Sequence, residues 1–259
     1  MSQPPLFENT VKFAGTIEYP QQLDEIVQEA FRRALSGVPG PTFVELPLGV
    51  MQAKYDGSPV LRPEQYRLVH QRADAQSIAE AKALLEGAKA PVLLLGQGCF
   101  VSRSHDLLTE LAGHLNCPIL QTNAVEQVLP GMEDRTFAYS SEVGAEIAGQ
   151  SDVVLAIGTE LGEALNYGRG HSWKPGNETR KWIYVERDAL AFGVNRPIDV
   201  PLVGDLRDIV PQLNAALAGV SRALPGGLAD WTARRDAHKQ AIEDYVPKRS
   251  MPIHPGLVP

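Results

Sequence analysis

The sequence has little cysteine, and two cysteines among 259 residues exclude a disulfide-stapled secreted scaffold. Cys99 and Cys117 each stand among apolar residues, which favours buried free thiols over a disulfide. No apolar run approaches the roughly 20 residues that a membrane-spanning helix needs. The first ten residues, MSQPPLFENT, contain neither the basic nor the apolar segment of a signal peptide. These absences predict a cytoplasmic protein without a membrane partner.

Charge of one sign is not concentrated anywhere in the chain. The 24 Lys and Arg residues and the 31 Asp and Glu residues give a net charge of −7 and are spread along the sequence. A nucleic-acid partner normally requires a basic patch, which is missing here. The hydrophobic fraction of 44% is enough for an ordinary buried core.

The motifs of common catalytic and metal sites are also missing. The six histidines are scattered, and neither an HxxxH nor a CxxC spacing that could hold a metal occurs. A Gly-x-Ser-x-Gly nucleophile elbow and a P-loop are absent as well. The sequence therefore predicts no metal site and no catalytic residue within this chain.

Between residues 90 and 218, short apolar runs alternate with helical patterns. Residues 91–96 form a continuous apolar run that is too short for a helix and is typical of a parallel strand buried on both faces. Further strands are expected at residues 118–122, 152–158, 181–185 and 201–204, and helices at residues 104–115, 142–148 and 205–217. This alternation predicts an α/β fold with a doubly wound, Rossmann-like parallel sheet.

Two details give local predictions about helix ends. Ser77 followed by Glu80 has the pattern of a capping box, so a helix is expected to begin there and to end near Gly87. Pro211 lies inside the last helical pattern, where it should kink the helix or delay its start.

The segments on either side of this region lack the alternation of strands and helices. Residues 1–55 contain one amphipathic helix, at residues 20–36, and one strand, at residues 42–46, which cannot bury both their faces alone. They are expected to be the tail of another domain. Residues 56–75, with Gly57, Pro59 and Pro63, predict a linker. Residues 76–219 are then the central α/β domain, and residues 220–259 a polar helix and a linker into a further domain.

Small and polar residues follow the predicted strands. The Gly96-Gln97-Gly98 turn begins like a dinucleotide-binding fingerprint, although Val101 stands where the third glycine belongs. The carboxyl ends of parallel strands line the ligand crevice of an open sheet. The candidate binding residues at these ends are Gly96, Gly98, Thr122, Gly158, Thr159, Glu186, Asp188, Gly204 and Asp205. A plain strand-to-helix turn, or a helix cap at Asp205, is the structural alternative.

Several stretches, in this order, resemble thiamine-diphosphate-dependent enzymes of the acetolactate synthase and benzoylformate decarboxylase type. Residues 36–47 (SGVPGPTFVELP) resemble the stretch that closes the pyrimidine-binding domain. Residues 188–197 (DALAFGVNRP) and 200–205 (VPLVGD) resemble a central-domain segment, and residues 252–255 (PIHP) resemble the entry into the diphosphate-binding domain. The resemblance covers nearly the whole chain.

The resemblance implies a homo-oligomeric lyase or transferase that acts on a small 2-oxo acid, with this chain as its central part. The glutamate that activates thiamine diphosphate would lie upstream of Met1. The Gly-Asp-Gly segment and the Asn that hold Mg²⁺ and the diphosphate would lie downstream of Pro259. The chain alone is therefore expected to be catalytically silent.

The resemblance also bears on the central crevice, which holds FAD in some relatives, ADP in others and no ligand in many. The FAD contacts would fall on the nine candidate binding residues. Flavin-binding relatives carry a Gly-Met-x-Gly loop followed by Ala-Asn, whereas this chain has Gly131-Met132-Glu133-Asp134. Glu133 and Asp134 are therefore expected to bring negative charge near the ligand.

Two other functions remain open from the sequence. One is a self-standing FAD- or ADP-binding regulatory module, for which the two flanks have no evident use. The other is an NAD-dependent deacylase, which shares this sheet topology but needs paired CxxC zinc ligands that this chain lacks.

Overall fold

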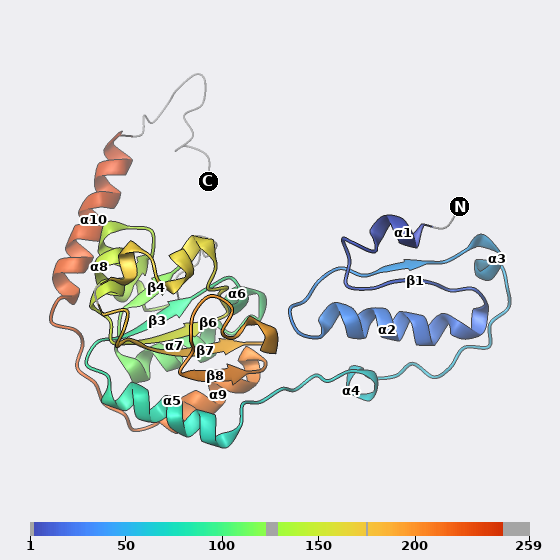
Figure 1. The fold of residues 1–259 in the computed structure, drawn as a ribbon, viewed down its shortest axis with the longest axis horizontal. Coiled ribbons are helices and arrows are strands. Elements are labelled where there is room, and N and C mark those ends of the chain that lie inside the picture. The colour runs from blue at the N-terminus through green and yellow to red at the C-terminus, as the bar shows by residue number, and fades with distance from the viewer. Residues whose placement is uncertain (1–2, 123–128, 175, 246–259) are drawn as a thin grey trace. The chain divides into compact units, whose positions relative to one another are not determined.

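The computed structural model describes residues 3–122, 129–174 and 176–245 (Figure 1). The chain forms two compact units, Met1–Gln71 with Arg187–Ala189 and Arg72–Glu186 with Leu190–Pro259. The division after Gln71 falls inside residues 56–75, and the assignment of the flanks to neighbouring domains stays a prediction. Residues 252–255, which carry part of the family resemblance, lie outside the described residues.

The first unit contains a small parallel sheet. Strands β1 (Ala14–Thr16) and β2 (Phe43–Glu45) pair side by side, and helix α2 (Leu23–Leu35) packs against both. β1 was not predicted, because three residues with a glycine among them give no apolar pattern. The remaining elements are α1 (Pro4–Phe7), η1 (Pro20–Gln22), α3 (Leu48–Met51) and α4 (Pro63–Tyr66).

A six-stranded parallel sheet forms the centre of the second unit, counted over its described residues. The strand order is β5-β4-β3-β6-β7-β8, so the chain starts in the middle at β3, builds to one side and then crosses to the other. The strands are β3 (Pro91–Leu95), β4 (Ile119–Gln121), β5 (Thr136–Ala138), β6 (Val153–Ile157), β7 (Lys181–Glu186) and β8 (Val200–Val203). This arrangement confirms the predicted doubly wound sheet.

Helices cover both faces of the sheet, as Figure 1 shows. Alternate residues of each strand point to opposite faces: Leu93 and Leu95 pack with α5 (Ala75–Gly87), α7 (His105–Leu115) and α9 (Leu206–Leu217). Val92 and Leu94 pack with α8 (Glu142–Gln150) and the start of α10 (Leu228–Tyr245). The shorter elements are α6 (Gly98–Val101), η2 (Glu133–Arg135), η3 (Glu163–Gly168), η4 (His171–Trp173) and η5 (Ala189–Ala191).

Helix α5 begins earlier than the capping-box pattern predicted. It starts at Ala75, and the Asp74 carboxylate accepts the backbone N–H of Ser77 at 2.9 Å. The prediction that Ser77 begins the helix is wrong, because Asp74 reaches the free amides of the first turn and Ser77 lies within it. The predicted end at Gly87 is confirmed.

The cap makes a specific stability prediction. Asp74→Ala is expected to lower the free energy of unfolding by about 1 kcal/mol, because it leaves first-turn amides without an acceptor. The matched variant Glu80→Ala, which removes the residue that a capping box would use, should change it by less than about 0.5 kcal/mol. Urea unfolding of both variants measures the difference, and equal losses would contradict the role of Asp74.

Pro211 does not delay the start of α9. The helix begins at Leu206 and continues past the proline to Leu217. Asp205 caps it by accepting the backbone N–H of Arg207 at 2.9 Å. The strong cap fixes the first turn ahead of the proline, so the predicted delay is wrong.

The first turns of α10 are bound to the sheet domain through Glu146 of α8. Its carboxylate accepts Trp231 Nε1 at 3.0 Å and Arg234 Nη1 at 2.6 Å. These two hydrogen bonds hold the pKa of Glu146 below its ordinary value of 4.5. Arg235 adds a contact with the Thr136 carbonyl of β5 at 2.9 Å.

This network predicts a pH-dependent attachment of α10. Because the pKa of Glu146 is lowered in the folded chain, its contribution is complete above 4.5 and is lost as the pH falls towards the lower folded value. Glu146→Gln should lower the protection factors of the amides at residues 231–235 at neutral pH, and acidification below the ordinary pKa of 4.5 should lower the same protection factors in the unchanged protein. Glu142→Gln is the control, because the Glu142 side chain is 92% exposed and its ion pair with Arg234 Nη2 is longer, at 3.3 Å. Equal exchange in the two variants would refute the role of Glu146.

Candidate functional site

The predicted binding residues of the sheet domain follow its strands at one edge. All strands are parallel, so the turns after β3, β4, β6, β7 and β8 lie at the same, carboxyl-terminal edge. The chain crosses from one side of the sheet to the other between β3 and β6, which places the crossing point beside Gly96 and Gly158. Ligands of doubly wound sheets bind at such a point.

The two turns at the crossing point touch each other directly. The Gly98 N–H donates to the Gly158 carbonyl at 2.8 Å, and the Gly96 N–H donates to the Ile157 carbonyl at 3.0 Å. A Cβ atom on Gly96 would lie 2.4 Å from the Gly158 oxygen and 2.4 Å from Thr159 Cβ. Gly158 itself has a φ of +59°, which favours glycine. These glycines are therefore required for contact between two turns, whatever else binds there.

Thr159 and Glu186 are joined by a tyrosine that the sequence patterns did not single out. The Tyr184 hydroxyl of β7 donates to the Thr159 carbonyl at 2.8 Å and lies 3.5 Å from Glu186 Oε2. Tyr184 is 2% exposed, so its ring belongs to the core while its hydroxyl ends at the carboxyl-terminal edge. A buried tyrosine near a strand end, with a polar tip to satisfy, is the signal that could have indicated it.

The other candidates have local partners. Thr122 is buried, and its N–H donates to the Leu95 carbonyl at 3.1 Å. The Gly204 N–H donates to the Glu186 carbonyl at 2.9 Å, and Asp205 caps α9. Asp188 groups with the first unit rather than with this edge. Asp205 therefore acts as the helix cap that the sequence also allowed. The binding roles of all nine candidate residues stay predictions.

The expectation for Glu133 and Asp134 is wrong. Both residues lie in η2, which directly precedes β5, and β5 is parallel to β4 with Thr136 opposite Ile119. They therefore lie at the amino-terminal edge of the sheet, away from the crossing point. No negative charge reaches the carboxyl-terminal edge from these residues.

A small cavity of about 80 Å³ lies near the carboxyl-terminal edge, between Tyr184, Glu160 and residues 191–198. Arg196 lines it, is only 6% exposed and lies with its guanidinium 4.0 Å from the Trp182 ring centre. It donates to the Gly168 carbonyl. Burial, together with the charges of Arg180 and Arg169, lowers the pKa of Arg196 to about 10. The guanidinium remains charged at neutral pH and ties the loop after β6 to the segment before β8.

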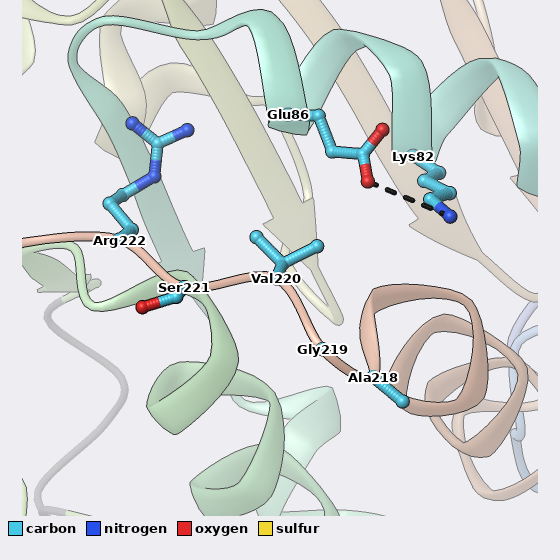
Figure 2. Close-up of a pocket in the computed structure, with 7 residues that line it drawn as sticks. All are labelled: Lys82, Glu86, Ala218, Gly219, Val220, Ser221 and Arg222. Carbon is cyan, nitrogen blue, oxygen red and sulfur yellow. Dashed lines mark ion pairs between the residues drawn. The ribbon is translucent and has the colours of Figure 1, made fainter.

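A larger open groove of about 510 Å³ lies between α5 and residues 218–222, which follow α9 (Figure 2). Figure 2 shows Lys82 and Glu86 turned towards each other, with Nζ and Oε1 3.6 Å apart, opposite residues 218–222. Both side chains are more than 40% exposed, and such a surface ion pair contributes little energy. Among the described residues, the side chains that line the groove include no nucleophile paired with a base, so the groove has no evident catalytic chemistry.

The described residues contain neither a metal cluster nor a membrane-spanning helix. No cluster of three or more His, Cys, Asp or Glu side chains that could hold a metal is found in residues 3–122, 129–174 and 176–245. None of the helices in those ranges is both long and apolar enough to cross a membrane. Cys99 and Cys117 are buried and free, as predicted.

The strand order, the parallel pairing and the glycine turns at the crossing point define a Rossmann-like domain. The profile of one family, "Thiamine pyrophosphate enzyme, central domain", matches residues 78–213, more than half of the chain. The chain therefore belongs to the thiamine pyrophosphate enzyme family, of which residues 78–213 form the central domain. The resemblance stated from the sequence is confirmed.

Curated relatives match beyond that domain. The chain is 28% identical over 245 residues to an acetolactate synthase of Mycobacterium bovis, which covers 91% of this chain and 38% of the relative. It is 29% identical over 218 residues to an acetolactate synthase of Arthrospira platensis, covering 78% and 36%. It is 26% identical over 267 residues to a probable acetolactate synthase large subunit of Methanococcus aeolicus, covering 98% and 44%. The chain thus spans less than half the length of these relatives.

Proposed function

We propose that this chain is the central part of a thiamine-diphosphate- and Mg²⁺-dependent enzyme that decarboxylates or joins 2-oxo acids, as in acetolactate synthases and related decarboxylases. The observation that carries the proposal is the similarity to acetolactate synthases over 91% of the chain, on both sides of the central domain. The substrate would be a small 2-oxo acid, and the full-length enzyme a cytoplasmic homo-oligomer.

Within that enzyme, the role of the chain is structural. Residues 1–55 would complete a pyrimidine-binding domain and residues 220–259 would lead to a diphosphate-binding domain. The first unit supports this role, because only Pro4, Ile17 and Ala30 are buried among its described residues. Two short parallel strands do not form a stable sheet alone, so further strands from the same domain would cover them. The thiamine diphosphate and Mg²⁺ sites would then lie in the neighbouring domains.

Nucleotide binding at the carboxyl-terminal edge is the second candidate, as FAD or ADP in the parent enzyme or in a self-standing regulatory module. The crossing point between β3 and β6 favours it, since nucleotides bind at such points in doubly wound sheets. The direct contact between Gly98 and Gly158 favours the structural role. Flavin absorbance of the purified chain, and calorimetric titration with ADP, test this candidate, and a stoichiometric ligand would support it.

The structural role is tested by assaying the chain with pyruvate, thiamine diphosphate and Mg²⁺. We expect no carbon dioxide and no acetolactate, because the residues that activate the cofactor are absent from the sequence. An open reading frame that also contains the missing glutamate and Gly-Asp-Gly segments should be active under the same conditions. Activity of the present chain alone would overturn the proposal that it is one part of a larger enzyme.

A further inference from the structure

A cavity of about 280 Å³ lies at the amino-terminal edge of the sheet, opposite the candidate binding residues. Its floor is formed by the starts of β3 and β4, at Pro91 and Pro118. Ile147 near the end of α8 forms one wall, and residues 222–227 with Trp231 form another. The family's cofactor chemistry takes place in other domains and at the other edge, so nothing described above uses this cavity.

The apolar side chains of the walls are well fixed. Cys117 is 1% exposed, Ile147 is 2% exposed and Trp231 is 8% exposed. The indole N–H of Trp231 is bound to Glu146, which holds the ring in place. A preformed apolar cavity favours a ligand with an apolar body. Its volume lies just below the range of about 300–1,000 Å³ that is typical of drug-sized ligands, so the ligand must be small.

The two charged side chains that line the cavity are both cations. Its lining contains Lys89 and Arg222 but no carboxylate among the described residues. The Arg222 guanidinium donates to the carbonyls of Ala88 and Leu85, both at 2.7 Å, so its charge is held in position by neutral groups. Lys89 is exposed at the rim. Two cations beside an apolar wall favour an anion with an apolar tail.

Two carboxylates, Asp152 and Glu146, lie just outside the lining and keep their negative charge. Asp152 accepts the backbone N–H groups of Lys89 and Ala90 at 2.7 and 2.9 Å. The Glu146 carboxylate accepts hydrogen bonds from Trp231 and Arg234.

The positive charge of Arg222 also acts on Cys117, which lies in the cavity wall. Burial raises the pKa of Cys117 to about 12, and the positive charges of Arg222 and Arg135 oppose that rise. Arg135 is itself paired with Asp134, at 3.1 Å.

We propose that this cavity binds a small organic monoanion with an apolar body, namely a short aliphatic or aromatic carboxylate. The apolar body lies between Ile147, the two prolines and Trp231, and the carboxylate lies towards Lys89 and Arg222. The site is independent of the proposed function, because it uses neither the candidate binding residues nor a thiamine cofactor.

The test uses the whole chain and three probes: phenylacetate, its uncharged amide phenylacetamide, and acetate. Calorimetry and tryptophan fluorescence should show phenylacetate binding with a Kd of about 1 mM or tighter. Phenylacetamide, which lacks the charge, and acetate, which lacks the apolar body, should each bind at least about tenfold more weakly. Absence of phenylacetate binding, or equal affinities for the acid and the amide, would overturn the proposal.

Variants locate the binding. Ala90→Leu and Ile147→Phe fill the cavity from two sides and should abolish phenylacetate binding if they fold. Lys89→Gln, a surface change that leaves the core untouched, should weaken phenylacetate severalfold and leave phenylacetamide unchanged. Lys82→Gln, in the groove of Figure 2, is the matched control and should bind like the unchanged chain. Unaltered binding in Lys89→Gln, or in a folded filling variant, places the ligand elsewhere and overturns the proposal.

Discussion

Arg180→Met is expected to lower the free energy of unfolding by about 3 kcal/mol or more. The Arg180 side chain is 3% exposed and donates to Ser151 O and Oγ, both at 2.9 Å. It also donates to the carbonyls of Ala148, at 3.0 Å, Gly149, at 3.1 Å, and Trp173. These acceptors lie at the ends of α8 and η4. Methionine would remove the donor that they share, although the Ala148 carbonyl would keep the Ser151 hydroxyl at 2.7 Å.

The matched controls separate this network from an ordinary loss of charge. Arg180→Lys keeps the charge but not the planar fork, so it should recover only part of the stability. Lys181→Met removes the neighbouring cation, which is 52% exposed and paired with Asp199, and should cost less than about 1 kcal/mol. Denaturant unfolding monitored by tryptophan fluorescence measures all three. A loss in Arg180→Met no larger than that in Lys181→Met would show that the network does not stabilise the fold.

Gly96→Ala is expected to destabilise the sheet domain by about 3 kcal/mol, with or without a nucleotide present. The new Cβ would lie 2.4 Å from the Gly158 oxygen and 2.5 Å from Thr159 Cα, both parts of a rigid turn. Neither turn can move without disturbing β3 or β6, which are paired along their whole length. The thermal midpoint of the purified chain measures the effect.

Gly113→Ala is the control for the same chemical change. Gly113 is exposed on α7, and a Cβ there meets nothing within 4 Å. Alanine should therefore stabilise the helix by about 0.5–1 kcal/mol. If Gly96→Ala instead leaves stability unchanged while abolishing the binding of a nucleotide, the glycine serves the ligand rather than the contact between turns.

The central strands could be predicted because burial on both faces makes them continuous apolar runs. β5 gave no such signal, since Thr136–Ala138 is a three-residue edge strand with a threonine at its start. Its omission also explains the error at Glu133 and Asp134. Without β5, the Gly131-Met132 pair looks like a loop after a strand rather than before one.

The candidate binding residues could be predicted as strand-end residues, because topology alone brings parallel strand ends to one edge. The contacts that these residues make with one another could not be predicted from the sequence. The distance between the Gly96 and Gly158 turns depends on the pairing of β3 with β6, which are separated by two other strands in the chain. Arg180 and Arg196 were missed for a related reason. Arginine is normally exposed, and both guanidinium groups donate to backbone carbonyls, which no sequence pattern identifies.

The two cysteines make this chain convenient for site-specific labelling. Burial raises the pKa of both Cys99 and Cys117 to about 12, so at neutral pH only on the order of one thiol in 10⁵ is ionised. A maleimide or spin-label reagent should therefore leave them unmodified in the folded protein. A single cysteine introduced at exposed Ala223 would react alone and report on the wall of the amino-terminal cavity.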